Sequence, residues 1–146
     1  MFATLRAMIV GVSLAAAALS HGPVQAQTVK SPVNKSQLEE KCDGRGRVSD
    51  AEQIAACTQI INNSGKYSAA ALNDTYFYRG LTYAQTNRCN LAIPDFTAAI
   101  KNDPKDADSY WSRHACKLEL GDKAGADADK KAAKALDPRI EEQWTQ

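Results

Sequence analysis

The sequence has almost no net charge, because 18 Lys and Arg residues stand against 17 Asp and Glu residues and leave a formal charge of +1. Most proteins that bind nucleic acid use a basic excess to neutralise phosphates. The balance therefore argues against a nucleic-acid partner, and no block of like charge marks an acidic or basic tail. At 146 residues the chain has the size of one domain.

Motifs that carry chemistry are also missing. The sequence contains no glycine-rich phosphate loop, no Gly-x-Ser-x-Gly, no His-Glu-x-x-His and no Cys-x-x-Cys. The four cysteines are separated by 15, 32 and 27 residues, which is unlike the short ligand spacing of a zinc site. His114 has no carboxylate or nucleophile at a defined spacing, as a general base would require. We therefore predict no catalytic residue, no metal, no cofactor and no enzyme activity.

Acidic residues are absent before Glu39, and Arg6 is the only charge ahead of an apolar run over residues 7–19. This run of 13 residues is shorter than the roughly 20 that cross a bilayer, so a membrane anchor is the weaker interpretation. Val24-Gln25-Ala26 follows with small residues at the first and third positions. Residues 1–26 are predicted to be a signal peptide cleaved near Ala26, and the mature protein is predicted to be exported, periplasmic or secreted, and soluble without stable membrane insertion.

Cleavage would remove Arg6 and no acid, so the mature chain would carry 17 charges of each sign and His114 as its one histidine. Its cysteines would enter an oxidising compartment, where disulfides persist. Residues 27–48 are polar, and we expect them to form a flexible lead-in that contains Cys42, with one turn of helix at 37–41.

The strongest internal pattern is a repeat of 34 residues, which places Asp103-Pro104 on Asp137-Pro138. A unit of this length accommodates two helices and two turns. The same shift aligns Tyr76 with Tyr110, Arg79 with Arg113, Ala92 with Ala126, Asp95 with Asp129 and Ala99 with Ala133.

This unit resembles the tetratricopeptide repeat, a helix hairpin with characteristic residues at seven spaced positions. Residues 73–106 match them with Tyr76, Gly80, Tyr83, Ala92, Phe96, Ala99 and Pro104. The resemblance implies an all-α fold, a short tetratricopeptide-like helix-hairpin solenoid of about two and a half repeats. Gly80 and Ala92 would let the two helices approach closely beside Phe96.

The other units match less well. Residues 107–138 form a weaker repeat, in which His114, Lys117 and Lys130 replace the small, tyrosine and aromatic positions. Residues 49–62 resemble the second helix of an earlier repeat with a reduced or missing first helix, and Ser49 and Glu52 form its capping box. The repeat domain is thus expected over residues 49–138, and residues 139–146 form a C-terminal cap.

Within this arrangement we predict one disulfide between Cys42 and Cys57, across a glycine-rich loop. A second between Cys89 and Cys116 fits neighbouring helix ends. The two other pairings stay open from sequence alone. Such bonds would strengthen a stack with fewer complete repeats than the three that stability usually needs.

The first helices of a repeat stack usually line its binding face. Here that face carries exposed aromatic and apolar positions, which suit an extended or helical peptide. The alternative is that Phe77 and Trp111 pack against the lead-in or a neighbouring helix. Arg79 and Arg113 are expected to pair with Asp95 or Asp129. The predicted groove residues are Phe77, Tyr78, Leu81, Trp111, Ser112 and Leu118.

We therefore expect a module that binds a protein or peptide partner through an aromatic groove. One alternative is a self-associating structural or assembly factor of the cell envelope, a homo-oligomer that uses the Trp111 face or the Trp144 end. The other is an enzyme acting on the cell wall, for which no residue pattern argues.

Overall fold

The computed structural model describes residues 34–145, and in that part of the chain it is all-helical, with no strand. The predicted signal peptide and the first part of the lead-in lie outside the described residues. The helices are α1 (Lys35–Cys42), α2 (Asp50–Asn62), the 3₁₀ turn η1 (Ser64–Lys66), α3 (Ala69–Gln85), α4 (Cys89–Asn102), α5 (Ala107–Glu119), α6 (Lys123–Leu136) and α7 (Ile140–Gln143).

Capping side chains account for the first two helix starts. Ser49 and Glu52 form the expected capping box at the start of α2. Asn34 and Gln37 form a second box at α1, which the sequence reading overlooked. The expectation of a flexible segment with one turn at 37–41 is therefore wrong over residues 35–42, where a capped helix of 8 residues forms.

Helix α3 begins earlier than the repeat alignment suggested. Ser68 accepts a hydrogen bond from the backbone N–H of Ala71, so the helix starts at Ala69 rather than near residue 73. The chain between α2 and α3 is correspondingly short and contains η1. The repeat boundary at residue 73 marks a packing register and does not mark a helix end.

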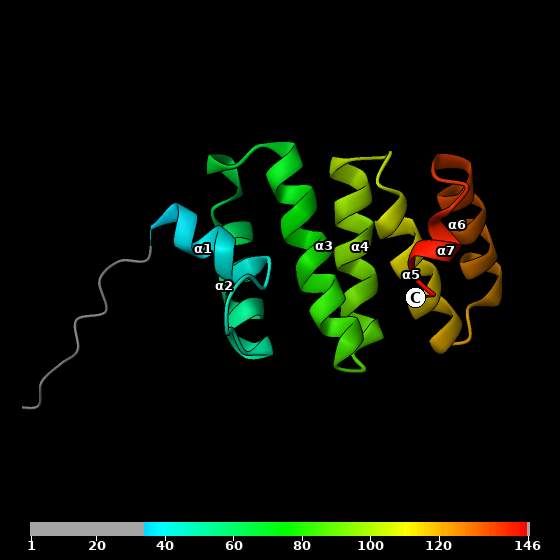
Figure 1. The fold of residues 1–146 in the computed structure, drawn as a ribbon, viewed down its shortest axis with the longest axis horizontal. Coiled ribbons are helices and arrows are strands. Elements are labelled where there is room, and N and C mark those ends of the chain that lie inside the picture. The colour runs from blue at the N-terminus through cyan, green and yellow to red at the C-terminus, as the bar shows by residue number, and fades with distance from the viewer. Residues whose placement is uncertain (1–33, 146) are drawn as a thin grey trace, which may run out of the picture. The chain divides into compact units, whose positions relative to one another are not determined.

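Consecutive helices pack against one another in chain order from α1 to α6, as Figure 1 shows. The pairs α3/α4 and α5/α6 are the two most extensive contacts and form two hairpins, and α4 joins them by packing on α5. Helix α1 packs beside α2 and so takes the place of the reduced first helix. The short α7 contacts α5 and α6 and buries Ile140, as expected of a cap.

The first hairpin depends on a close helix approach at Gly80. A Cβ atom added to Gly80 would lie 2.9 Å from Cε1 of Phe96, and that ring is completely buried. The predicted role of Gly80 is confirmed. In the second hairpin the buried His114 stands at the equivalent position and its Nδ1 lies 2.9 Å from the carbonyl oxygen of Ala126.

Two disulfides join the helices, and both are the predicted pairs. Cys42–Cys57 ties α1 to α2, with the Cα atoms 4.8 Å apart. Cys89–Cys116 ties the start of α4 to α5, with the Cα atoms 5.1 Å apart. Each bond lies among buried apolar side chains. The second bond links the two hairpins and so helps to fix the surface between α3 and α5.

Candidate functional site

Two matching arginine contacts set the spacing of the helices around the candidate site. Arg79 on α3 donates to both carboxylate oxygens of Asp95 on α4, at 2.8 and 2.7 Å, and also to Thr58 on α2 at 2.9 Å. Arg113 on α5 repeats this pattern one unit later. Arg113 donates to Asp129 on α6 and to Thr97 on α4. Each arginine therefore joins its own hairpin to the preceding helix, so the two arginines have a structural role, as expected.

The second of these contacts has an additional cation. Lys117, which replaces the repeat's tyrosine, places its ammonium 2.8 Å from Asp129. Burial acts to raise the pKa of Asp129, but hydrogen bonds from Arg113 and Lys117 outweigh it and leave the pKa below its usual value. Lys117 thus holds α5 and α6 together where the aromatic packing of the first hairpin is missing.

The candidate site is a cavity of about 390 Å³ between α3 and α5, which we call the α3–α5 cavity. Its apolar lining comes from both helices, from the Cys89–Cys116 disulfide and from the C-terminal Trp144. The volume falls in the usual range of ligand sites, which are mostly apolar with a few placed polar groups. Its lining residues are Leu81, Ala84, Gln85, Cys89, Trp111, Ser112, Ala115, Cys116, Glu119 and Trp144.

One polar group in this lining has no partner. Ser112 is 6% exposed, and its Oγ makes no hydrogen bond within the described part of the chain. Buried hydroxyls nearly always find a partner, since leaving one unpaired costs about 1–3 kcal/mol. The Oγ atom itself has almost no exposed surface, so this hydroxyl is enclosed by protein atoms and is not presented to the cavity.

The C-terminal segment forms one wall of the cavity. Glu141 on α7 binds Lys130 at 2.8 Å and also pairs with Lys134, and the hydrogen bonds from these two lysines lower the pKa of Glu141 to about 2. Trp144 then reaches α5, where its Nε1 donates to Asp108 at 3.0 Å. The carboxylate of Glu141 and the indole of Trp144 thus fix the cap against the repeat.

The predicted groove residues do not all reach this cavity. Leu81, Trp111 and Ser112 line it. Phe77 instead packs into the core beside Phe96, with ring centroids 6.2 Å apart, as the alternative interpretation expected for this residue. Leu118 is 47% exposed, and it does not line the cavity because its side chain faces solvent.

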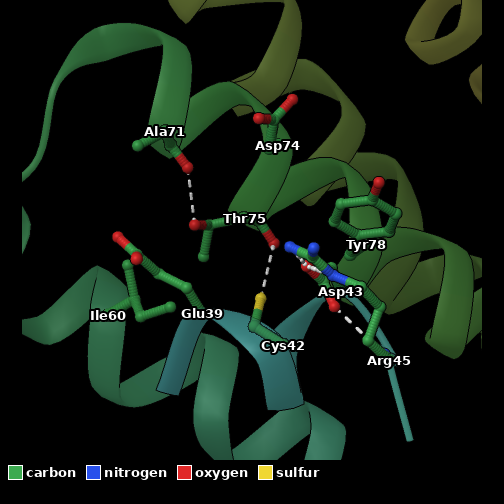
Figure 2. Close-up of a pocket in the computed structure, with 9 residues that line it drawn as sticks. All are labelled: Glu39, Cys42, Asp43, Arg45, Ile60, Ala71, Asp74, Thr75 and Tyr78. Carbon is green, nitrogen blue, oxygen red and sulfur yellow. Dashed lines mark hydrogen bonds and ion pairs between the residues drawn. The ribbon is translucent and has the colours of Figure 1, made fainter. Parts of the chain in front are cut away.

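Tyr78 lines a different cavity of about 260 Å³, the α1–α3 cavity, shown in Figure 2. Asp74 and Tyr78 come from α3, while Glu39 comes from α1 and Arg45 from the loop after it. Arg45 pairs with Asp43, whereas Asp74 has no cation partner in the described structure. Burial raises the pKa of Asp74, and the charges of Asp106 and Asp43 raise it further. The remaining lining is Cys42, Asp43, Ile60, Ala71 and Thr75.

Sequence reasoning placed Trp144 near the end of the stack but not in the cavity wall. Its bond to Asp108 spans 36 residues, and no local pattern encodes such a contact.

Among residues 34–145, no group of three or more His, Cys, Asp or Glu side chains is placed to hold a metal ion. None of the described helices has both the length and the apolar composition of a bilayer-spanning helix.

Fold and site together define an all-α, helical repeat-like protein with two disulfides and an apolar cavity between the first helices of its two hairpins. No protein-family model matches the chain, and none of the curated proteins compared with it shows significant sequence similarity. The functional argument therefore rests on the cavity itself.

Proposed function

We propose that the protein is a tetratricopeptide-like repeat module that binds a protein or peptide partner in the α3–α5 cavity. The family assignment is supported by the seven matched positions of residues 73–106 and by the repeated arginine contacts. The half repeat, the two hairpins and the cap would then form a short solenoid.

The observation that carries the binding role is the presence of two tryptophans in the lining of one largely apolar cavity. Trp111 and Trp144 supply large apolar surfaces, and tryptophan is enriched among the residues that dominate binding energy. These features suit a polypeptide segment, and we propose binding rather than catalysis.

Export is part of the same proposal. Two disulfides are typical of proteins that mature in an oxidising compartment. A signal peptide over residues 1–26 and a periplasmic or secreted location would provide that compartment. N-terminal sequencing of the mature protein after expression in a bacterial host tests this, and an N-terminus at residue 27 is expected.

The binding role is tested with a displayed peptide library and the purified protein with both disulfides formed. We expect selected peptides to bind wild type and Trp111→Ala to weaken them at least tenfold, because hot-spot tryptophans contribute about 2 kcal/mol or more. Leu120→Ala is the matched control, since Leu120 is 54% exposed and lies outside the cavity. Equal binding by wild type and Trp111→Ala would contradict the proposal.

Self-association through the Trp111 face or the Trp144 end is the second candidate role. Light scattering across a wide concentration range separates the two. A mass that rises with concentration and falls back in Trp111→Ala would favour self-association, whereas a constant monomer mass together with peptide binding supports the module.

A further inference from the structure

The α3–α5 cavity has a carboxylate but no cation to match it. Glu119 lies at the end of α5, is exposed, and lines the cavity. Its Oε2 lies 3.3 Å from the Sγ of Cys89, but that sulfur belongs to a disulfide and has no proton to donate. No Lys or Arg lines this cavity in the described part of the chain. The charge of Glu119 is therefore available to a ligand.

The rest of the lining suits the particular shape of a basic side chain. Lysine and arginine combine an apolar stem with a cationic end, and the stem packs on apolar surface while the end meets a carboxylate or an aromatic face. Leu81 and Ala84 are available to the stem, and Trp144, which is 40% exposed, presents an indole.

The protein already holds one of its own lysines in this way. The ammonium of Lys130 lies 5.4 Å from the centroid of the Trp111 ring and is bound by Glu141 at 2.8 Å. Trp144 and Glu119 both line the α3–α5 cavity, and its lining contains no lysine or arginine of the described chain.

We propose that the segment bound in the α3–α5 cavity inserts a Lys or Arg side chain, whose stem packs on Leu81 and Trp144 and whose charge pairs with Glu119. This inference rests on the proposed function and adds the chemistry of the partner to it.

A second carboxylate, Asp74 on α3, extends the preference for positive charge. Asp74, Tyr78, Leu81 and Gln85 follow one another at helical spacing, so they form one stripe that runs from the α1–α3 cavity to the α3–α5 cavity. Asp74 has no cation partner in the described structure. A partner with a further basic residue would gain from this charge as well.

The test compares the peptides selected by wild type with those selected by Glu119→Gln and Glu119→Lys. Wild type is expected to enrich Lys or Arg at one position, and Glu119→Gln to weaken these peptides roughly five- to tenfold, in the range of a well-placed ion pair with an aromatic neighbour. Glu119→Lys is expected to select an acidic residue there instead. Glu142→Gln, which removes the same charge outside the cavity, is the matched control and should bind like wild type.

The outcomes separate this inference from the proposed function. Peptides without a basic residue that still depend on Trp111 but not on Glu119 would overturn the inference and leave the binding role intact. Binding that is unaffected by Trp111→Ala would overturn both. A free alkylamine that binds as tightly as the peptides would show an amine site and would contradict the assignment to a polypeptide.

Discussion

At the scale of single residues, Arg79 and Arg113 differ in whether their aspartate partner keeps a second cation when the arginine is replaced. Asp95 is bound by Arg79 and by no other cation in the described structure, and its side chain is 6% exposed. Asp129 is bound by Arg113 and also by Lys117. An unpaired buried carboxylate is costly, because it keeps its desolvation penalty without the compensating charge.

We therefore predict that Arg79→Met lowers the free energy of unfolding by about 3 kcal/mol or more, and that Arg113→Met lowers it by roughly half as much. Urea denaturation of the two variants measures the difference. The double variant Arg79→Met/Asp95→Leu should recover part of the loss, because it removes the stranded charge as well. Equal losses in the two single variants would contradict the role given to Lys117.

Asp74 is predicted to destabilise the fold slightly at neutral pH. Burial raises its pKa, with added repulsion from Asp106 and Asp43, so the folded state favours the protonated carboxyl. A raised acid pKa means that stability is greatest below the unfolded-state pKa and is lost as the pH rises through the folded-state pKa.

Asp74→Asn removes this effect and is expected to raise the stability at pH 7 by less than about 0.5 kcal/mol, as is usual for exposed positions. The gain should vanish at about pH 3, where wild type is protonated in both states. Thermal unfolding at the two pH values measures it. A gain of the same size at both would show that the charge is not its cause.

At the scale of the elements, the disulfides compensate for helices that are weak alone. Helix α1 has only 8 residues, and isolated helices below about 12–15 residues are marginal in water. Cys42 at its end is joined to Cys57 on α2, which is fully buried. The bond keeps α1 in its packed position.

Replacing Cys42 and Cys57 together by serine should cost about 3 kcal/mol, the chain-entropy value for a loop of 15 residues. Hydrogen exchange should then show that the amides of α1 lose protection while those of α4 to α6 keep theirs. Cys89→Ser/Cys116→Ser is the comparison, and it should leave α1 protected. Unchanged protection of α1 in the first variant would contradict its dependence on the bond.

Much of the element order could be read from the sequence, and what was missed has physical causes. Tyr76, Ala92 and Ala99 recur 34 residues later as Tyr110, Ala126 and Ala133, so the hairpin was visible in the spacing. Loop length and neighbouring helix ends favoured the two cysteine pairs that form, although the other pairings stayed open from the sequence. The start of α3 was missed because the repeat register at residue 73 does not coincide with the cap at Ser68.

At the scale of the whole molecule, the cavity was only partly predictable. Helical spacing places Leu81, Trp111 and Ser112 on one face, and they line the cavity. The same spacing cannot distinguish Phe77, which enters the core, because that depends on the angle between helices. Trp144 reaches the cavity because its indole donates a hydrogen bond to Asp108 and because Lys130 and Lys134 form ion pairs with Glu141 on α7. These contacts join segments that are distant in the sequence.

In the described part of the chain, the packed helices present an apolar cavity between α3 and α5, and Trp144 from the C-terminal segment contributes to its wall. The arginine contacts and the Cys89–Cys116 bond fix the distance between α3 and α5, so the cavity is formed before any partner binds. A preformed site avoids the entropy cost of ordering its own side chains on binding.

The most direct test of this account is a map of amide chemical shifts in the wild-type protein titrated with a selected peptide. The account predicts that the largest changes fall on Leu81, Gln85, Ser112, Ala115 and Glu119 and on the indole N–H groups of Trp111 and Trp144. Changes centred on α2, or on the outer face of α6, with the cavity residues unmoved would contradict it.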